Sequence, residues 1–500
     1  MTTNLNTKQI QEILPFSIKI DYFLKNNPNI LIGFVISFLS CIIVYGFELT
    51  HFTVSIDEDT TDNFLHMIDL GRWSHAFLKE YIFPEPWSPF SSMLVAIIGI
   101  SGASAACCYI LNLGKVNSLF FSVLFISLPQ FAYQLQFSNQ DETFGLAILL
   151  AACSGIFALQ NRKSSLVIFV LLNVIVLSIY QSLIFFSATL ITLKLLNDSC
   201  HDKCTYKKWF FTSSKVALGL ITSVIIYLII TTKIKHHFGV SSSSYFTDLI
   251  TWHELGFANG IKNSFSFIYD RTGPYPLYGL ATYSFSYFAA AVILLINITK
   301  RKAILPLIIV TLTLSLLMPF ALNLMIGGGT PGRTLSQLSL VFAGLVTICI
   351  SNFKCKSVKY LSAIFFLIVG CTSTSQLFYS DYISEKQNEL LARRITSDIY
   401  SKYPSFDGAI NRVLFIGKAN VINRWKKFNS DDFGVSFFER GDSGRIINYI
   451  NISGIDTLKN MPINKFNKVS KEEINKMPSW PNQGSIQMLE SNIVVKLSEI

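Results

Sequence analysis

Apolar runs of membrane-spanning length recur along the first three quarters of the chain. A hydrocarbon core about 30 Å thick needs roughly 20 apolar residues per helix. The first run is not followed by a small-residue cleavage site, so we expect a retained signal anchor. The pattern predicts a polytopic α-helical membrane protein with about 11 transmembrane helices, near 30–49, 91–112, 118–135, 144–160, 166–180, 182–196, 216–232, 280–298, 304–325, 335–351 and 360–377.

The stretch 166–196 decides the number of crossings. As a single helix it would be about 47 Å long, which exceeds the hydrocarbon thickness. Tyr180, Gln181 and Ser182 interrupt it, so we expect two short helices joined by a tight turn. With that turn the basic clusters all fall on one side, which is the cytoplasm by the positive-inside rule. The N-terminus is then expected inside and the C-terminus outside.

This topology predicts three parts: a cytoplasmic segment 1–29, a transmembrane domain 30–377 with outer loops 50–90 and 233–279, and an outer domain 378–500. The last 124 residues hold 31 charged residues, an ordinary share for a soluble domain. Helical spacing at 384–403 and short strands at 412–416, 433–438 and 492–497 predict a small α/β fold there. Because most residues outside the membrane lie on the outer face, we expect the protein to act there.

Composition agrees with the bilayer and excludes several classes. The chain is 51% hydrophobic and 14% charged, against a typical charged share of roughly 25%. Its net charge of +10 reflects basic cytoplasmic links, so we expect no nucleic-acid partner. The nine cysteines lie in apolar spans or basic loops, which predicts no disulfide framework. Without a P-loop or a paired-histidine metal motif, an ATP-driven pump and a membrane metalloprotease are both disfavoured.

Loop 50–90 carries the most suggestive chemistry. It holds seven acids and two bases, and Asp57, Glu58 and Asp59 stand together just outside the first span. Consecutive carboxylates repel one another, which raises the pKa of at least one. Such a carboxylate suits general-base work on a sugar hydroxyl. The alternative is a solvated acidic loop that helps to set topology or binds a cation. We predict no bound cofactor or metal, although a divalent ion between Asp57 and Asp59 stays open.

Aromatic and polar residues at the same level are candidates for sugar binding. Trp73 and Trp87 either form an interfacial belt or stack on a sugar ring. A buried Gln between the two short helices needs a partner. The alternative is that the short polar connections are simple turns. The candidates are His66, Trp73, Trp87, Asn139, Gln140, Asp141, Tyr180 and Gln181.

Three cations near the outer face are candidates for binding a lipid phosphate. Arg72 lies beside Trp73, and Arg271 lies in a tyrosine-rich stretch. Arg333 ends the Gly-rich loop 327–333, whose backbone N–H groups suit a phosphate. That loop lacks the ending of a P-loop, so nucleotide binding is not expected.

Several of these motifs occur together in one known family. The acidic sequence IDED at 56–59 follows the first span, GRW follows at 71–73, and Tyr180-Gln181 lies between paired helices. The chain ends with MPSWP at 477–481, Gly484-Ser485 and IVVKL at 493–497. In this order the motifs resemble the phage-type, serotype-converting O-antigen glucosyltransferases of enteric bacteria. The resemblance runs from about residue 30 to the end.

The resemblance implies a fold and a reaction. The family belongs with the GT-C type glycosyltransferases, multi-pass proteins of the bacterial inner membrane. It implies transfer of glucose from undecaprenyl-phosphate glucose to a sugar of the lipid-linked O-antigen repeat at the periplasmic face, with inversion. It also implies a flippase and a lipid-linked-glucose synthase as partners. An acid of the first outer loop would act as base, and Phe433 and Lys496 become candidates for acceptor binding or domain docking.

Other readings stay open on the sequence alone. A transferase of the same type could use another lipid-linked sugar, because the pocket shape decides the sugar. A transporter or flippase for lipid-linked sugars would show paired broken helices and polar residues at mid-membrane. Here the polar clusters lie at one surface. A sensor would need an output domain, and the cytoplasmic links are short.

Overall fold

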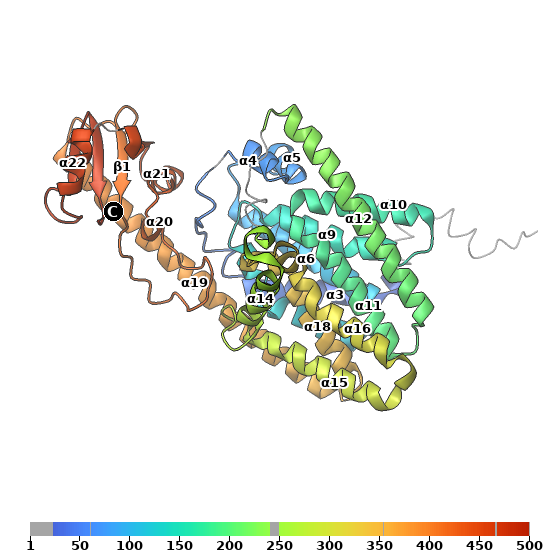
Figure 1. The fold of residues 1–500 in the computed structure, drawn as a ribbon. Coiled ribbons are helices and arrows are strands. Elements are labelled where there is room, and N and C mark those ends of the chain that lie inside the picture. Colours follow the sequence, from blue (N-terminus) through green and yellow to red (C-terminus); the bar gives the residue numbers. More distant parts are fainter. Residues whose placement is uncertain (1–23, 61, 241–249, 354, 466–467, 500) are drawn as a thin grey trace, which may run out of the picture.

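The protein is a bundle of helices with a small α/β domain held away from it on one long helix (Figure 1). This computed structural model describes residues 24–60, 62–240, 250–353, 355–465 and 468–499. Among these residues, nine helices are long and apolar enough to cross a membrane: Pro28–Tyr45 (α3), Pro89–Ile110 (α6), Asp141–Ala158 (α9), Gln181–Cys200 (η1 and α11), Tyr206–His237 (α12), Leu280–Lys300 (η2 and α15), Lys302–Ile326 (η3 to α17), Gly332–Ser351 (η5 and α18) and Lys356–Lys402 (α19). Two shorter apolar helices join them, α7 (Lys115–Ser127) and α10 (Lys163–Ile179).

The break expected near residue 180 is present. Helix α10 ends at Ile179, and Tyr180 is extended, with φ −150° and ψ 104°. The short helix η1 (Gln181–Leu183) then leads into α11 (Ile184–Cys200). The extended residue reverses the chain at one end of the bundle and places the buried Tyr180 and the half-buried Gln181 there.

Two predicted spans have different lengths in the structure. The span expected at 118–135 ends as a helix at Ser127, and a four-residue helix α8 (Ala132–Leu135) follows. Pro129 separates them, because proline lacks the N–H that would continue the helix. The span expected at 216–232 is instead the 32-residue helix α12. The outer loop predicted at 233–279 therefore begins inside a helix.

Much of that predicted outer loop is itself helical. Helix α14 (Trp252–Thr272) occupies it, with a kink at Gly256, where φ is +71°. A left-handed φ suits glycine, so the kink falls on the residue that accepts it at least cost. The predictions for 241–249 lie outside the described residues.

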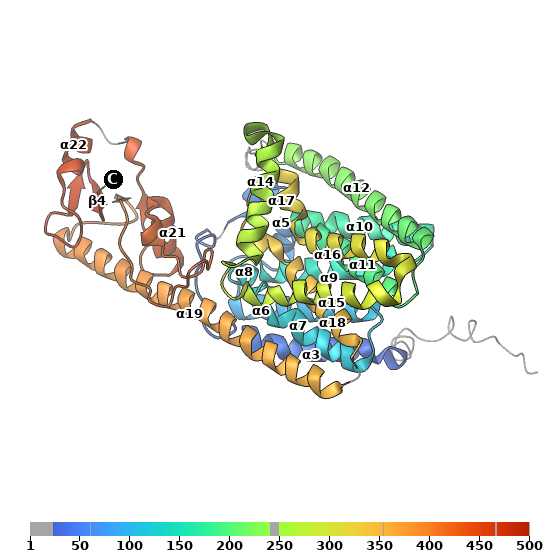
Figure 2. The ribbon, with the colours of Figure 1, turned by 60° about the horizontal axis from the view of Figure 1, so that its bottom comes forward.

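Helix α19 carries the chain out of the bundle without a break. It runs for 47 residues through the regions predicted as a span at 360–377 and a separate helix at 384–403. Figure 2 shows it lying along α3 and α7 and then continuing beneath the C-terminal domain. The boundary drawn at 377 from the rise in charge falls in the middle of this helix, because helical hydrogen bonding does not depend on side-chain polarity.

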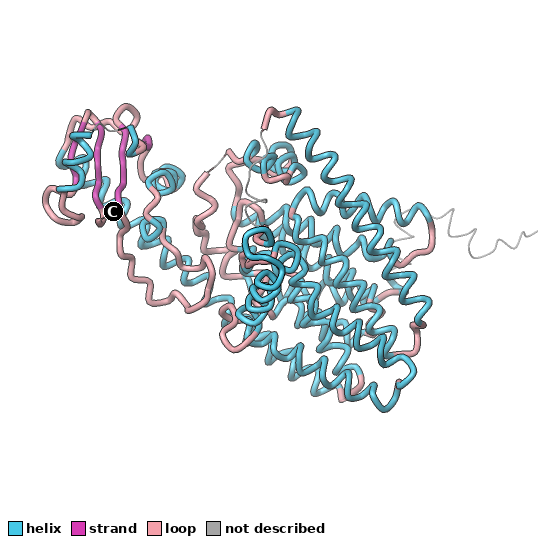
Figure 3. Tube along the Cα trace, viewed as in Figure 1, coloured by secondary structure: helices cyan, strands magenta, loops and turns pink. Residues whose placement is uncertain are grey.

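The C-terminal domain has a four-stranded sheet in the order β2-β1-β4-β3, which Figure 3 shows in magenta. Strand β1 (Arg412–Ile416) pairs in parallel with β4 (Asn492–Lys496) and β2 (Lys459–Asn460). Strand β3 (Ile486–Leu489) pairs with β4 in antiparallel fashion.

The strand predicted at 433–438 was wrong. Gly434 has φ +72°, and Ser436 caps the short helix α20 (Phe437–Arg440) by accepting a hydrogen bond from the Phe438 N–H. A turn and a short helix bury the apolar side chains of this segment. A short apolar run in the sequence is compatible with either arrangement, so it did not distinguish a turn and helix from a strand.

Two apolar contacts help to fix the C-terminal domain to the bundle. Ile56, in the loop after α3, is buried in the domain core with Ile395 and Ile446. From the domain, Phe433 packs edge-on against Tyr133 and Phe378, with ring centroids 5.4 and 5.7 Å away. The loop after α3 is thus shared between the two parts of the molecule.

Helices α6 and α9 approach each other through glycines. A Cβ on Gly99 would lie 2.2 Å from the carbonyl oxygen of Gly145, a backbone atom that cannot turn aside. We expect Gly99→Ala to force the helices apart at a cost of about 1–3 kcal/mol. The thermal unfolding temperature in detergent measures this. Gly114→Ala is the control, because a Cβ there meets nothing within 4 Å. Equal unfolding temperatures for the two variants would contradict the packing argument.

Candidate active site

A cavity of about 620 Å³ opens where the loop after α3, the helix ends and the C-terminal domain meet. Six of its lining residues were predicted from the sequence as site residues. They come from the loop after α3, helix α4 (Phe64–Asp69) and its C-terminal turn, the turn before α9 and the short helix η5 (Gly332–Leu335) before α18. These six are Asp57, Asp59, His66, Arg72, Gln140 and Arg333.

Asp57 lies at the centre of an ion-pair network. Its Oδ2 is 2.8 Å from Arg333 Nη1, and its Oδ1 is 3.4 Å from Arg445 Nη1. Burial acts to raise the pKa of Asp57, but the two guanidinium groups outweigh it and the pKa is lowered. Asp57 therefore stays ionised, and it holds two cations at the cavity wall.

Asp59 faces the same cavity in a different environment. Asn448 Nδ2 donates to its Oδ2 at 3.2 Å, and Arg445 Nη1 lies 3.8 Å from its Oδ1. Burial raises the pKa of Asp59, and these partners only partly oppose the shift. This carboxylate therefore has a greater proton affinity than Asp57.

Glu58 points the other way, into the protein. It is fully buried, and its two oxygens accept hydrogen bonds from the backbone N–H groups of Ser55 at 2.8 Å and Asn139 at 2.9 Å. Burial raises the pKa of Glu58 to about 8 despite these two donors. It does not line the cavity, and its role is to pin the acidic loop to the turn before α9.

Arg72 lies in the same cavity beside the helix break. Its Nε and Nη1 donate to Gln181 Oε1 at 3.4 Å and Gln140 Oε1 at 3.5 Å, and its guanidinium lies 4.8 Å from the Tyr180 ring centroid. Gln181 Nε2 in turn donates to the Leu70 carbonyl at 2.8 Å. At the helix break, Tyr180 thus presents its aromatic face to this cation and Gln181 presents its amide oxygen.

Other predicted residues lie around the cavity rather than in it. Asn139 contributes its backbone N–H to Glu58, and Asp141 begins α9 with both carboxylate oxygens buried and without a hydrogen-bond partner among the described residues. Trp73 donates to Thr231 Oγ1 at 3.2 Å and packs between helices. Trp87 is half-buried and does not line the cavity.

Three of the predicted residues serve other contacts in the structure. The guanidinium of Arg271 lies 5.0 Å from the Phe267 ring and does not line the cavity. Phe433 docks the C-terminal domain, as described above. Lys496 is buried, with Nζ 3.0 Å from the Asn475 carbonyl and 2.9 Å from Glu499. Lys496 is the last residue of β4, and these contacts stabilise that end of the strand.

Sequence reasoning missed two residues that reach the site from the C-terminal domain. Arg445 and Asn448 lie on α21 (Ser443–Ile452), one turn apart, and both reach the acidic loop. Arg445 also donates to the Ile56 carbonyl. Nothing in the local sequence marks them, because their meaning depends on the contact between α21 and a loop almost 400 residues earlier.

Metal binding receives no support from the side-chain geometry. Across the described ranges, no three His, Cys, Asp or Glu side chains come together in a way that could hold a metal ion. Asp57 and Asp59 are instead partnered by Arg445.

Taken together, the apolar helices and the cavity of carboxylates and arginines at one end of them define a polytopic membrane protein with a polar site at one end of its helices. The family model described as glucosyl transferase GtrII matches residues 46–351, and the chain belongs to this glucosyltransferase family. The match confirms the resemblance found in the sequence motifs, and it ends before the C-terminal domain. Comparisons with curated proteins and with solved structures gave no match.

The buried position of Glu58 predicts a stability effect with a defined pH dependence. Glu58→Gln replaces one of two acceptors and leaves one backbone N–H unsatisfied, which costs about 1–3 kcal/mol. A carboxyl whose pKa rises from 4.5 to about 8 on folding holds its proton more tightly in the folded state. The contribution of Glu58 to the free energy of unfolding therefore falls as the pH increases from 4.5 to about 8. We expect the gap in unfolding temperature between wild type and variant to narrow from pH 4.5 to pH 8, and a constant or widening gap would contradict this.

Proposed function

We propose that this protein transfers glucose from undecaprenyl-phosphate glucose to a sugar of the lipid-linked O-antigen repeat, at the periplasmic face of the bacterial inner membrane. One observation carries the proposal. A single cavity at the end of the apolar helices combines four aspartates, among them Asp57 and Asp59, with three arginines, Arg72, Arg333 and Arg445. Membership of a glucosyltransferase family supports the sugar. A flippase and a synthase of the lipid-linked glucose would supply the donor.

The arginines suit the leaving group. When the bond between glucose C1 and the phosphate oxygen breaks, the electron pair stays on the phosphate and its negative charge grows. Charge-assisted hydrogen bonds strengthen as this charge develops. Arg72 lines the same cavity as the two aspartates and donates to the amide oxygens of Gln181 and Gln140, so its guanidinium lies within reach of a phosphate bound there.

A carboxylate suits the attacking side. The acceptor hydroxyl forms the new bond to C1 from the face opposite the phosphate, so the configuration inverts, and its proton passes to a carboxylate. Asp59 is the base in this proposal, because it lines the cavity and burial raises its pKa. Asp57 positions Arg333 and Arg445, and its lowered pKa makes it the weaker base.

The distinction between the acids is testable with purified protein in nanodiscs. With radiolabelled undecaprenyl-phosphate glucose and a lipid-linked O-antigen repeat, Asp59→Asn should bind donor normally and lose at least about 100-fold in turnover, as expected for a general base. Asp57→Asn should weaken donor binding as well, because it releases two arginines.

Two outcomes would count against this assignment. If Asp59→Asn keeps its turnover while Asp57→Asn loses it without weaker donor binding, the base is Asp57. If wild type transfers no glucose but moves lipid-linked sugars across the bilayer, the transferase proposal fails and a transporter replaces it.

Arg445 tests whether the C-terminal domain takes part in the reaction. Arg445→Gln removes a cation that contacts Asp57 and Asp59, and we expect transfer to fall by roughly 10- to 100-fold. Arg393→Gln is the matched control, because Arg393 is exposed on α19 and pairs with Glu389. Equal rates for the two variants in the same assay would show that the domain only docks against the site.

A further inference from the structure

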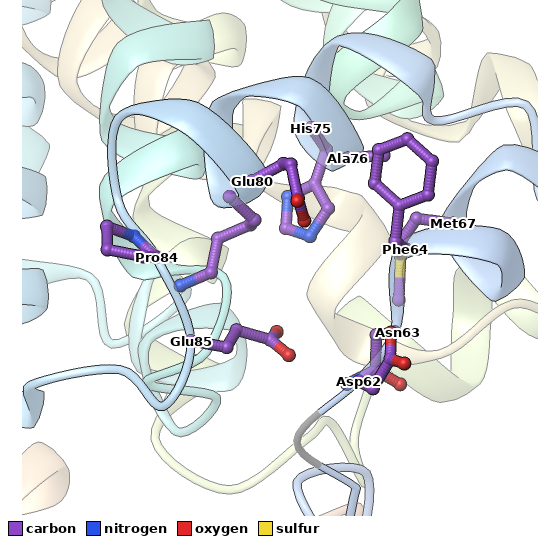
Figure 4. Close-up of a pocket in the computed structure, with 10 residues that line it drawn as sticks. Asp62, Asn63, Phe64, Met67, His75, Ala76, Glu80, Pro84 and Glu85 are labelled. Atoms are coloured by element: carbon purple, nitrogen blue, oxygen red, sulfur yellow. The ribbon is translucent and has the colours of Figure 1, made fainter.

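A second cavity, of about 310 Å³, adjoins the first. Helix α4, helix α5 (Trp73–Tyr81) and the turn after it enclose this space, and Figure 4 shows their side chains around it. Asp62, Asn63 and Met67 line both cavities, so the two share a wall. We propose that the second cavity binds the acceptor as a neutral or amine-bearing sugar residue, next to the hydroxyl that receives glucose. This inference rests on the proposed function.

His75 gives the second cavity a fixed hydrogen-bond acceptor. The Thr143 hydroxyl donates to the Gln140 carbonyl at 2.9 Å, so its oxygen must accept from the His75 Nδ1–H, 2.8 Å away. Burial, with Arg72 and Lys79 nearby, lowers the pKa of His75 to about 3, so the ring is neutral. A neutral imidazole that donates through Nδ1 has a bare lone pair on Nε2.

That lone pair faces the cavity and is available to a ligand. His75 is only 4% exposed and lines the cavity, and Figure 4 shows its ring directed into the space. Within the described part of the chain, the structure gives Nε2 no hydrogen-bond partner. An acceptor that faces a cavity in this way can take a hydrogen bond from a ligand hydroxyl without first giving up a protein partner.

The charges around the cavity favour hydroxyls over phosphate. Lys79 lines it, but its ammonium is paired with the buried carboxylate of Glu142 at 2.8 Å. The remaining charged side chains are all acids: Asp62, Glu80 and Glu85. Burial raises the pKa of Glu85, as expected for a carboxyl drawn out of water. Such a lining accepts hydrogen bonds from a sugar and repels an anionic one.

Apolar side chains complete a surface suited to a sugar ring. Phe64, Met67, Ala76 and Pro84 lie between the polar groups. A few convergent polar atoms set in an apolar wall are typical of small-ligand sites. Because the first cavity holds the arginines that suit the donor phosphate, the second is left for the other substrate.

Three variants separate this role from a structural one. His75→Asn keeps an amide N–H where Nδ1 donates to Thr143 but removes the Nε2 acceptor, whereas His75→Gln restores a polar atom near the Nε2 position. Glu85→Gln removes a lining carboxylate. Glu254→Gln is the matched control, because Glu254 is exposed on α14 and lines neither cavity. All are made in the full-length protein in nanodiscs.

Two reactions of radiolabelled undecaprenyl-phosphate glucose serve as the assay: transfer to the lipid-linked O-antigen repeat, and hydrolysis by water without an acceptor. We expect His75→Asn and Glu85→Gln to raise the acceptor KM by roughly 5- to 10-fold, as for the loss of one hydrogen bond. Donor KM and hydrolysis should stay at wild-type values. His75→Gln should recover part of the loss, and Glu254→Gln should match wild type.

Each other outcome overturns the inference in a recognisable way. A raised donor KM or slower hydrolysis would mean that the glucose of the donor fills this cavity. An unchanged acceptor KM in both His75→Asn and Glu85→Gln would mean that the acceptor does not reach it, while the proposed function would stand. If wild type neither transfers nor hydrolyses the donor, the proposed function fails and this inference fails with it.

Discussion

One carboxylate, Asp57, holds together three segments that are far apart in the sequence. Arg333 reaches it from the short helix η5 before α18 and Arg445 from the C-terminal domain. Withdrawing a carboxylate from water costs free energy unless a cation pairs with it. If one member of such an ion pair is removed, the member that remains is left with an uncompensated desolvation cost. The loop, the bundle and the domain therefore stay in register because none of them can leave without stranding a charge.

The same network gives three adjacent acids different chemistry. Glu58 turns inward to backbone N–H groups, while Asp57 and Asp59 face the cavity. Asp57 has two guanidinium partners at 3.4 Å or less, and Asp59 has a neutral amide and a more distant arginine. The direction and the partners of each side chain, more than the residue type, thus give the three acids different roles. Glu58 anchors the loop, Asp57 is the centre of the ion pairs, and Asp59 has a raised proton affinity.

The sequence predicted the parts of the fold that depend on local chemistry. The turn at Tyr180 and the strand at 412–416 follow from polar interruption and from β-propensity, and the structure has both. The span at 118–135 was too long, because apolar length was weighed above the proline at 129. The strand at 433–438 was wrong, because a buried apolar run of that length fits a turn and helix equally well.

The sequence predicted the site residues that the order of the membrane crossings places at one end of the bundle, and no others. Placing Asp57, Arg72 and Arg333 at the same end of the bundle followed from counting crossings, and all three line one cavity. Arg445 and Asn448 required the docking of α21 against the acidic loop, which no spacing along the chain encodes. Arg271 was predicted for the same face as the other cations, but it packs on Phe267 and does not line the cavity, so the predicted topology alone did not decide the contact.

Charge separates the two cavities although they share a wall. The larger one concentrates arginines near its carboxylates, and the smaller one holds acids with its single lysine neutralised. Among the residues that line the two cavities, guanidinium groups occur only in the larger one, so an anionic group finds cationic partners there and only acids and a paired lysine in the smaller one. Under the proposed function, this difference would sort two lipid-linked substrates by the position of their charge, because complementary potentials give orientation more than affinity. The acidic loop, which forms one wall of the larger cavity and runs on to residues lining both, is the element that makes this sorting possible.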